Sequence, residues 1–327
     1  MRGTSLPYVE DDETIYSFCA TAHAWSGSDR AEHTARALTG AATSARHHDL
    51  PLALRNFPLD QTRHPVDAFH WATTHTIAGY YVPFMSRAAQ ELASAAWFTG
   101  GPKARSLING KIDGVRLEHP LKWCEDCAEG DIERLGRPYW HVAHQFPTTW
   151  QCAFHRRPLR CIQARRKRWL LPRDVEAGAT AQTIKGADFP IAGLLAALGE
   201  VIRSVAQVDR MQIVAMSAEK LRALGLASET NSEPLEEWFR SSRVSRFLLT
   251  CPPGLMMLAD GHWIARHVSP RTLAHPIHCT LLWCAFDWDS PETAAATFRQ
   301  ASSGCARFDS HRSATLKGAR QHSFEAN

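Results

Sequence analysis

Four residues with metal-binding side chains stand in the sequence as two pairs of equal spacing. Cys124 and Cys127 are separated by two residues, and Cys152 and His155 repeat that spacing after twenty-four intervening residues. Two ligands at this spacing form a tight turn that directs both side chains at one ion, and two such turns complete the tetrahedron that Zn²⁺ prefers. Because four protein ligands leave no position for water, the pattern predicts one structural zinc ion rather than a catalytic one.

The second pair is less constrained than the first. His141, His144 and Cys161 lie close in the sequence, and each could replace His155 as the fourth ligand. Cysteines also serve as small buried core residues, and a single Cys-x-x-Cys occurs in redox proteins. The repeated spacing favours zinc over both alternatives.

The composition is that of a globular protein with a mild basic excess. The chain has 327 residues, of which 44% are hydrophobic, and a formal net charge of +4. This length allows two or three domains. The first twelve residues lack the apolar segment of a signal peptide, and no run of about eighteen uncharged apolar residues follows. We therefore expect a cytoplasmic protein without a membrane segment, whose cysteines are reduced and available to a metal.

A basic segment begins directly after His155. Residues 156–173 contain no aspartate or glutamate and place Trp169 among the cations. Arginine can bond two phosphate oxygens at once and tolerates partial desolvation, so this segment predicts contact with nucleic acid. A solvated basic surface and an acidic protein partner are the alternatives. The nucleic-acid-binding candidates are Arg156, Arg157, Arg160, Arg165, Arg166, Lys167 and Arg168.

The residues before the metal pattern favour helices. Apolar positions recur at helical spacing over 11–23, and a second helical pattern runs from Ser28 to Leu38 with Gly40 beyond it. Two short helices joined by a glycine-containing turn are compatible with a helix-turn-helix. Further helices are predicted over 65–77 and 86–98, and short strands over 106–121 lead into the zinc-binding segment.

The residues after 186 also favour helices. We expect helices over 189–205, over 217–224 with Ser217 as the N-cap, and over 232–247. The last two permit another helix-turn-helix, with Arg240, Arg243 and Arg246 available for backbone contacts. An apolar run over 277–286 predicts a buried helix, and the last twenty or so residues are expected to fray.

These elements predict a mainly α fold with a small β zinc ribbon. An N-terminal helical part is expected at 1–105 and a zinc ribbon with the basic segment at 106–175. A helical C-terminal domain, which permits the second helix-turn-helix, follows at 186–290. A polar tail is expected at 291–327.

Several segments together resemble the TniQ family, whose best-studied branch is the TnsD type of transposon target-selection protein. The clearest are Cys-x-x-Cys at 124–127, Gly-Arg-Pro-Tyr-Trp at 136–140, His-Gln-Phe-Pro at 144–147 and Cys-Ala-Phe-His-Arg-Arg-Pro-Leu at 152–159. Weaker similarities are Glu-Thr-Ile-Tyr-Ser-Phe at 13–18, His-Thr-Ile at 75–77 with Tyr-Val-Pro-Phe at 81–84, and His-Pro-Ile-His at 275–278. The prolines usual in the family's two metal turns are replaced here by Glu125 and Ala153. A second zinc motif and a long C-terminal DNA-reading extension, both found in longer relatives, are not recognisable.

The resemblance implies a non-enzymatic adaptor for target-site selection in DNA transposition. Such proteins bind DNA or dock on an RNA-guided Cascade-type complex, recruit a TnsC-type AAA+ ATPase, and can act as homodimers. The alternative is a zinc-stabilised DNA-binding regulator or structural factor outside transposition. An enzyme is not expected, because the His-Glu-x-x-His, zinc-deaminase and P-loop motifs are absent from the sequence.

Overall fold

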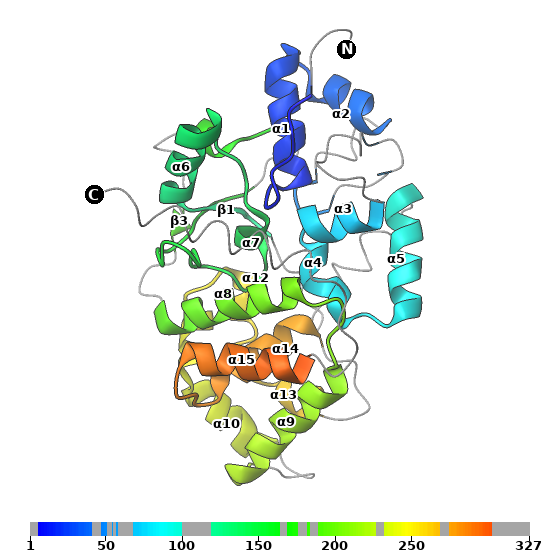
Figure 1. Ribbon diagram of the computed structural model, residues 1–327. Coiled ribbons are helices and arrows are strands. Elements are labelled where there is room, and N and C mark those ends of the chain that lie inside the picture. Colours follow the sequence, from blue (N-terminus) through cyan, green and yellow to red (C-terminus); the bar gives the residue numbers. More distant parts are fainter. Residues whose placement is uncertain are drawn as a thin grey trace, which may run out of the picture.

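The computed structural model describes residues 6–40, 47–50, 54, 57, 68–99, 119–163, 169–175, 182–183, 189–226, 232–268 and 275–302. Helices dominate these residues, and their three short strands form one small sheet. The predicted mainly α fold with a small β element is therefore confirmed. In Figure 1 the N-terminal helices and the segment around α6 lie side by side in the upper half, and helices α8–α15 fill the lower half.

The N-terminal helices enclose buried side chains. The elements are α1 (Ile15–Ser26), α2 (Ala31–Thr39), α3 (Ala68–His75), α4 (Ala78–Tyr81), η4 (Val82–Phe84) and α5 (Arg87–Thr99). Thr14 accepts a hydrogen bond from the Ser17 N–H and so begins α1, while Gly27, with φ of 63°, ends it. The predicted helices are present. All residues of α1 up to Ala22 are buried. A DNA-reading helix-turn-helix in this part of the chain stays a prediction.

The central segment combines the sheet with two helices. Its elements are β1 (Leu121–Trp123), α6 (Glu125–Leu135), α7 (Val142–Gln145), β2 (Arg160–Ile162), η5 (Pro172–Asp174) and β3 (Gln182–Thr183). The strands are antiparallel in the order β1-β2-β3. The predicted strands over 106–121 fall mostly outside the described residues. Half of the segment between the two candidate ligand pairs is helical, where a small ribbon had been expected.

The regular elements of the C-terminal segment are all helices over its described residues, and turns connect them. Its helices are α8 (Phe189–Ser204), α9 (Arg210–Ala223), α10 (Glu233–Ser241), α11 (Arg243–Leu248), α12 (Pro253–Met256), α13 (Ile264–His267), α14 (Pro276–Ala285) and α15 (Pro291–Ser302). The helices α8 and α14 agree closely with the predictions over 189–205 and 277–286. A second DNA-reading helix-turn-helix stays a prediction.

Three details of this segment differ from the sequence predictions. Asp209 begins α9 by accepting a hydrogen bond from the Gln212 N–H, so Ser217 lies buried inside the helix and is not its N-cap. The predicted helix over 232–247 is divided at Ser242, which has extended backbone and caps α11. Residues 291–302 were expected to begin a polar tail, but they form α15, which packs on α8 and buries Phe298.

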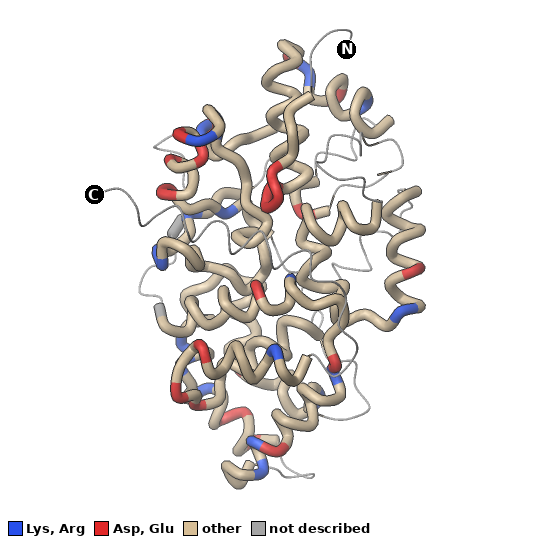
Figure 2. The backbone as a smooth tube through the Cα atoms, in the orientation of Figure 1, with Lys and Arg blue, Asp and Glu red and all other residues tan. Residues whose placement is uncertain are grey.

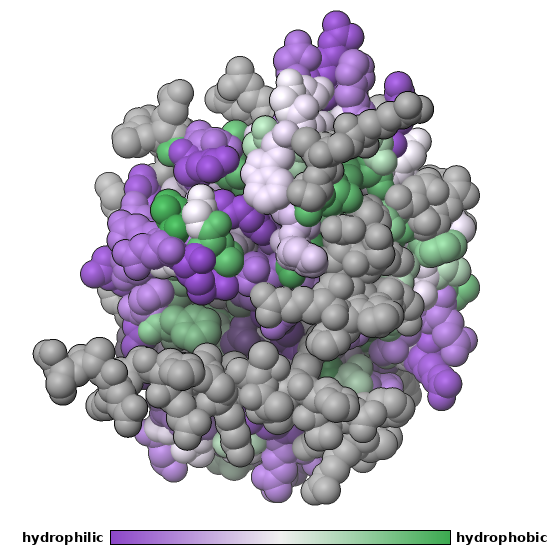
Figure 3. All heavy atoms as spheres, turned by 45° about the horizontal axis from the view of Figure 1, so that its top comes forward, coloured by the Kyte–Doolittle hydropathy of each residue, from purple (hydrophilic) through white to green (hydrophobic). Residues whose placement is uncertain are grey.

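One hydrophobic core includes side chains from all three parts of the chain. The Tyr80 hydroxyl contacts the hydroxyls of Thr148 at 3.2 Å and Thr280 at 2.9 Å, so it joins the N-terminal, central and C-terminal parts. Charged residues lie mainly on the outer turns (Figure 2), and hydrophobic residues on the face in Figure 3 form small patches bordered by hydrophilic ones. Among the described residues, no helix is long and apolar enough to span a bilayer. The predicted domain boundaries stay predictions.

Candidate metal centre

The start of α6 and the turn before β2 position the two ligand pairs. Cys124 is the N-cap residue of α6 and Cys127 lies in its first turn, where residues three apart share one face. In the second turn, the Cys152 N–H donates to the Arg157 carbonyl oxygen and the Arg156 N–H donates to the Cys152 carbonyl oxygen, both at 2.9 Å. Antiparallel pairing of β1 with β2 then brings the two turns together.

The four ligand atoms form a compact group. His155 Nδ1 lies 3.5, 3.3 and 3.6 Å from the Sγ atoms of Cys124, Cys127 and Cys152, and the last two sulfurs are 3.6 Å apart. In a tetrahedral zinc site, bonds of about 2.3 Å to sulfur and about 2.1 Å to nitrogen place neighbouring ligand atoms roughly 3.6 to 3.8 Å apart. The group therefore fits one tetrahedral ion. Within the described part of the chain, it is the one set of three or more such side chains with this geometry.

The protonation of the thiols also favours a bound cation. Hydrogen bonds from Cys127 and Cys152 hold the pKa of Cys124 well below its usual range. Hydrogen bonding to Cys124 raises the pKa of Cys127 and of Cys152 above the usual value. One thiolate is thus stabilised by two thiols, and a divalent cation would supply the positive charge that three thiolates together require.

His155 fits the fourth position better than the alternative ligands do. His144 Nε2 is 4.0 Å from the Cys127 sulfur, and His144 lies outside the compact group. Burial lowers the pKa of His144 to about 3, so its ring is neutral beside the cluster. His141 is held between two carboxylates, and Cys161 belongs to β2. The four residues named from the sequence are the ones that the structure brings together, and their role as metal ligands stays a prediction.

The His-Gln-Phe-Pro segment connects α7 to β1. The Gln145 side chain accepts from the Lys122 N–H at 3.0 Å and donates to the Lys122 carbonyl oxygen at 2.7 Å, as a neighbouring strand would. The Lys122 ammonium is buried and donates to the carbonyl oxygens of Phe146 and Thr149, both at 2.6 Å. Burial lowers the pKa of Lys122 to about 7. These bonds fix the strand that ends at Cys124.

The Gly-Arg-Pro-Tyr-Trp segment contacts the Glu-Thr-Ile-Tyr-Ser-Phe segment near the N-terminus. Arg137 donates to both carboxylate oxygens of the buried Glu13, at 2.6 and 2.7 Å. The Trp140 N–H donates to the Ser17 hydroxyl at 3.1 Å. Gly136, with φ of 71°, ends α6 just before this contact. Two segments that carry the family resemblance therefore form a single interface.

A second charged group joins the same parts of the chain to α8. The His141 ring donates to the carboxylates of Asp12 at 3.1 Å and Asp131 at 2.9 Å, and Arg203 of α8 pairs with Asp12. Burial alone would lower the pKa of His141, but the two carboxylates raise it to about 9. Sequence reasoning considered His141 only as an alternative metal ligand, because its spacing from the cysteines was the available signal.

A comparison with protein families matches the TniQ family to residues 6–159. Residues 6–159 of this chain therefore carry a TniQ domain. The matched range begins ahead of Glu13 and contains all four ligand residues, the Glu13–Arg137 contact and the Gln145 connection to β1. A TniQ domain indicates a protein associated with target selection in DNA transposition. A search of curated proteins returned no match to this chain.

The basic segment overlaps the end of the TniQ domain, and two of its arginines are already paired. Arg157 donates to Asp126 at 3.0 Å, and Arg160 donates to Glu125. Both acids belong to the first turn of α6, whose outer side carries further acidic residues in Figure 2. The segment 156–173 is free of acids in sequence, but the fold places acids beside it. These pairs reduce the cationic charge available to a ligand.

Arg156 and Phe154 lie on the outer side of the second turn. Arg156 is exposed, and no ion pair links it to a described residue. It is also the single non-glycine residue with positive φ in the described part, at 53°. Phe154 is 79% exposed. The indole N–H of the buried Trp169 donates to the Ala31 carbonyl oxygen, so that ring belongs to the core.

The remaining nucleic-acid-binding candidates lie outside the described residues. They are Arg165, Arg166, Lys167 and Arg168.

Proposed function

We propose that this TniQ-family protein acts as a non-enzymatic adaptor that selects target sites for DNA transposition. The match of the TniQ family to residues 6–159 is the observation that carries the proposal. The candidate metal centre supports it, because four protein ligands complete a tetrahedral ion and leave no position for a substrate or a reactive water. The centre is therefore suited to a structural role.

The proposed ion is one Zn²⁺ held by Cys124, Cys127, Cys152 and His155. Three thiolates and one imidazole in a tetrahedron are a donor set typical of structural zinc. Bound zinc would neutralise the thiolates and hold the turn that carries Phe154 on its exposed side. Folding of that turn and binding of the ion then share one free energy.

The proposed nucleic-acid contact rests on Arg156 and on the four candidates at 165–168. Arg157 and Arg160 contribute less, because each must exchange a carboxylate partner for a phosphate. The exposed Phe154 is two residues before Arg156 in the same turn and would supply a stacking surface for an unpaired base.

DNA or an RNA-guided Cascade-type complex would supply the target, and a TnsC-type AAA+ ATPase would be the recruited partner. A homodimer is also proposed from the resemblance to the family. The alternative, a zinc-stabilised DNA-binding regulator outside transposition, shares the metal centre but needs no ATPase. Binding to an ATPase encoded beside this gene therefore separates the two functions, because only the adaptor should retain it in a pull-down.

Binding to duplex DNA across a salt series tests the nucleic-acid contact. Each phosphate contact contributes about 0.9 to the slope of log affinity against log salt, so replacing all four candidates at 165–168 with alanine should lower the slope by up to about 3.6. Arg157→Ala with Arg160→Ala is the matched control and should change the slope less. A flat plot for the unmodified protein, or unchanged binding after the fourfold replacement, would remove the segment from the interface.

Metal analysis of the purified protein tests the centre. We expect one zinc per chain, loss of zinc in Cys152→Ser, and retention in His155→Cys, which keeps a competent ligand. Folded protein that binds DNA without zinc would contradict the structural role.

A further inference from the structure

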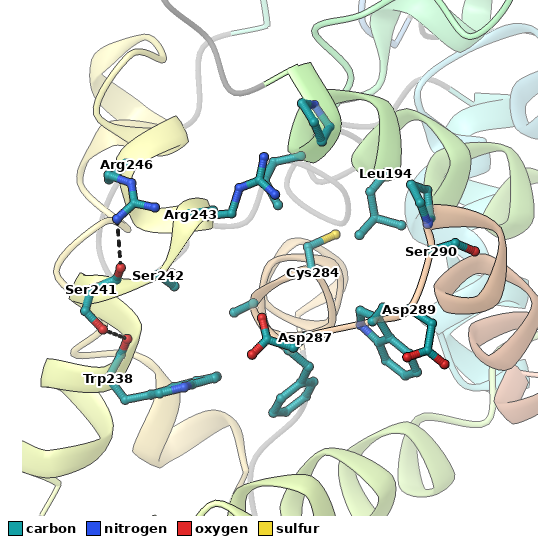
Figure 4. Close-up of a pocket in the computed structure, with 16 residues that line it drawn as sticks. Leu194, Trp238, Ser241, Ser242, Arg243, Arg246, Cys284, Asp287, Asp289 and Ser290 are labelled. Atoms are coloured by element: carbon teal, nitrogen blue, oxygen red, sulfur yellow. Dashed lines mark hydrogen bonds between the residues drawn. The ribbon is translucent and has the colours of Figure 1, made fainter.

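A cavity of about 490 Å³ lies in the C-terminal part, away from the metal centre. Its walls come from the first turns of α8, the corner between α10 and α11, and the connection from α14 to α15. Figure 4 shows the side chains from these three walls around a common space, with Cys284 at its centre. This size is in the range of sites that bind small ligands or a few residues of a peptide.

The two charged walls of this cavity have opposite signs. Arg243 and Arg246 lie on the α11 side, and Asp287 and Asp289 lie on the α14–α15 connection across from them (Figure 4). Both aspartates are exposed, and neither has an ion pair with a described residue. Arg246 donates to the Ser241 carbonyl oxygen at 3.1 Å, which orients its guanidinium along this wall. The cavity therefore has a positively charged wall and, across from it, a negatively charged wall.

Apolar side chains form part of the surface between the charged walls and are held by packing. Ile191 and Leu194 of α8 are buried, and Trp238 lies beside Phe286 with ring centroids 5.6 Å apart. The Trp288 indole N–H donates to the Trp283 carbonyl oxygen at 2.7 Å, which holds the connection that carries both aspartates. A ligand would meet a smaller apolar area, which includes the half-buried Trp238, within a mostly polar and charged lining.

This arrangement favours a peptide over a nucleic acid. Phosphates entering from the arginine wall would approach two aspartates on the other side, and like charges at an interface oppose binding. A peptide can place residues of both signs on either side of an apolar side chain. We propose that the cavity binds a short segment of a protein partner. The segment places lysine or arginine against Asp287 and Asp289, an apolar residue over Trp238, and an acidic residue toward the arginine wall.

The proposal rests on the proposed function in one respect, namely that the chain acts by binding a protein partner. It adds the place of binding and the chemistry of the bound segment. The site lies on α8, α11 and the α14–α15 connection, beyond the end of the match at residue 159.

Selection from a displayed library of random short peptides on the immobilised full chain tests the inference. We expect enriched peptides with a basic residue beside an apolar one, followed by an acidic residue. For a synthetic peptide of that kind, Asp287→Lys with Asp289→Lys should weaken binding at least about tenfold in fluorescence anisotropy. The same variant should select peptides in which the basic residue is replaced by an acidic one.

The matched control carries the same change of charge away from the cavity. Glu219→Lys with Glu237→Lys alters two exposed acids that do not line it, and should leave peptide binding unchanged. Circular dichroism and the thermal midpoint check that all variants are folded.

Three results would overturn the inference. They are an absence of enriched peptides, equal weakening by the control variant, and displacement of the peptide by a short single-stranded oligonucleotide. A dimer that dissociates in Asp287→Lys with Asp289→Lys, without selection of basic peptides, would assign the cavity to a second copy of the chain. If the unmodified protein does not bind the ATPase, the proposed function is contradicted. The selection of peptides and its dependence on charge would still support the cavity as a peptide-binding site.

Discussion

The buried ion pair between Glu13 and Arg137 predicts a large loss of stability when one partner is neutralised. The Glu13 side chain is 0% exposed and that of Arg137 is 9% exposed. Glu13→Gln keeps the size of the side chain but leaves the guanidinium charge buried without its counter-charge. Removing one partner of a buried pair typically costs about 3 to 5 kcal/mol. Because the amide keeps one acceptor and Arg137 also donates to the Tyr8 carbonyl oxygen, we expect about 3 kcal/mol.

A double-mutant cycle separates the pair from the general cost of substitution. Arg137→Met leaves the buried Glu13 carboxylate with the Glu10 N–H at 3.2 Å but without its counter-charge, and should cost at least as much as Glu13→Gln. The double variant buries neither charge, so its loss of stability should be about 2 kcal/mol smaller than the sum of the two single losses. The matched control is the pair of Arg87 and Glu91, which lies 3.5 Å apart with side chains 91% and 71% exposed. Its coupling should be at most about 0.5 kcal/mol.

Equilibrium unfolding in urea is the appropriate assay, with the same zinc concentration in every sample because an ion bound by the folded chain would add to its stability. The free energies of unfolding of the variants should be compared only where the slope of free energy against urea concentration is the same. A loss below about 1 kcal/mol for Glu13→Gln, or additive losses in the cycle, would refute the conclusion that this pair holds the TniQ domain together.

Three further predictions concern other parts of the fold. Stability should fall as the pH drops from about 6.5 to about 4, because unfolded His267 gains a proton at its usual pKa while burial lowers the pKa of the folded side chain to about 4. His267→Leu should flatten the dependence of the urea midpoint on pH over that range. Gly193→Ala should destabilise by about 1 kcal/mol or less and weaken metal retention, because its Cβ would lie 2.7 Å from the oxygen at the end of the Gln151 side chain, which must shift from its hydrogen bond to the Arg156 carbonyl oxygen in the second turn. Metal content and unfolding measure the two effects. Arg156→Gly should gain up to about 1 kcal/mol of stability by relieving the positive φ, whereas Arg157→Gly should gain none, and unfolding of both variants checks this difference.

Patterns between near neighbours were predicted well from the sequence. The spacing of the four candidate ligands named a group whose donor atoms the structure brings within 4.8 Å of one another. Apolar periodicity predicted a helix over 86–98 where α5 covers Arg87–Thr99, and a buried helix over 277–286 where α14 covers Pro276–Ala285. Periodicity, caps and short ligand spacings act within one or two turns of chain, so they can be read without knowledge of the fold.

Errors arose where a local signal had a stronger competitor. Ser217 resembled an N-cap, but Asp209 supplies the cap earlier and α9 continues through the serine. The polar composition after 291 indicated a tail, but the face of α15 that carries Phe298 packs on α8. Burial against another helix stabilises a segment whose average composition is polar.

By itself, the sequence predicted the helical class, a group of four Cys and His residues that the fold brings together, and the resemblance to the TniQ family. Only the tertiary structure decided which charges meet. Glu13 and Arg137 are 124 residues apart in sequence, and Arg157 and Asp126 are 31 apart. These contacts depend on how α1, α6 and β2 pack together. A run of basic residues therefore predicts positive charge, but the acids that the fold places beside it decide how much remains available to a ligand.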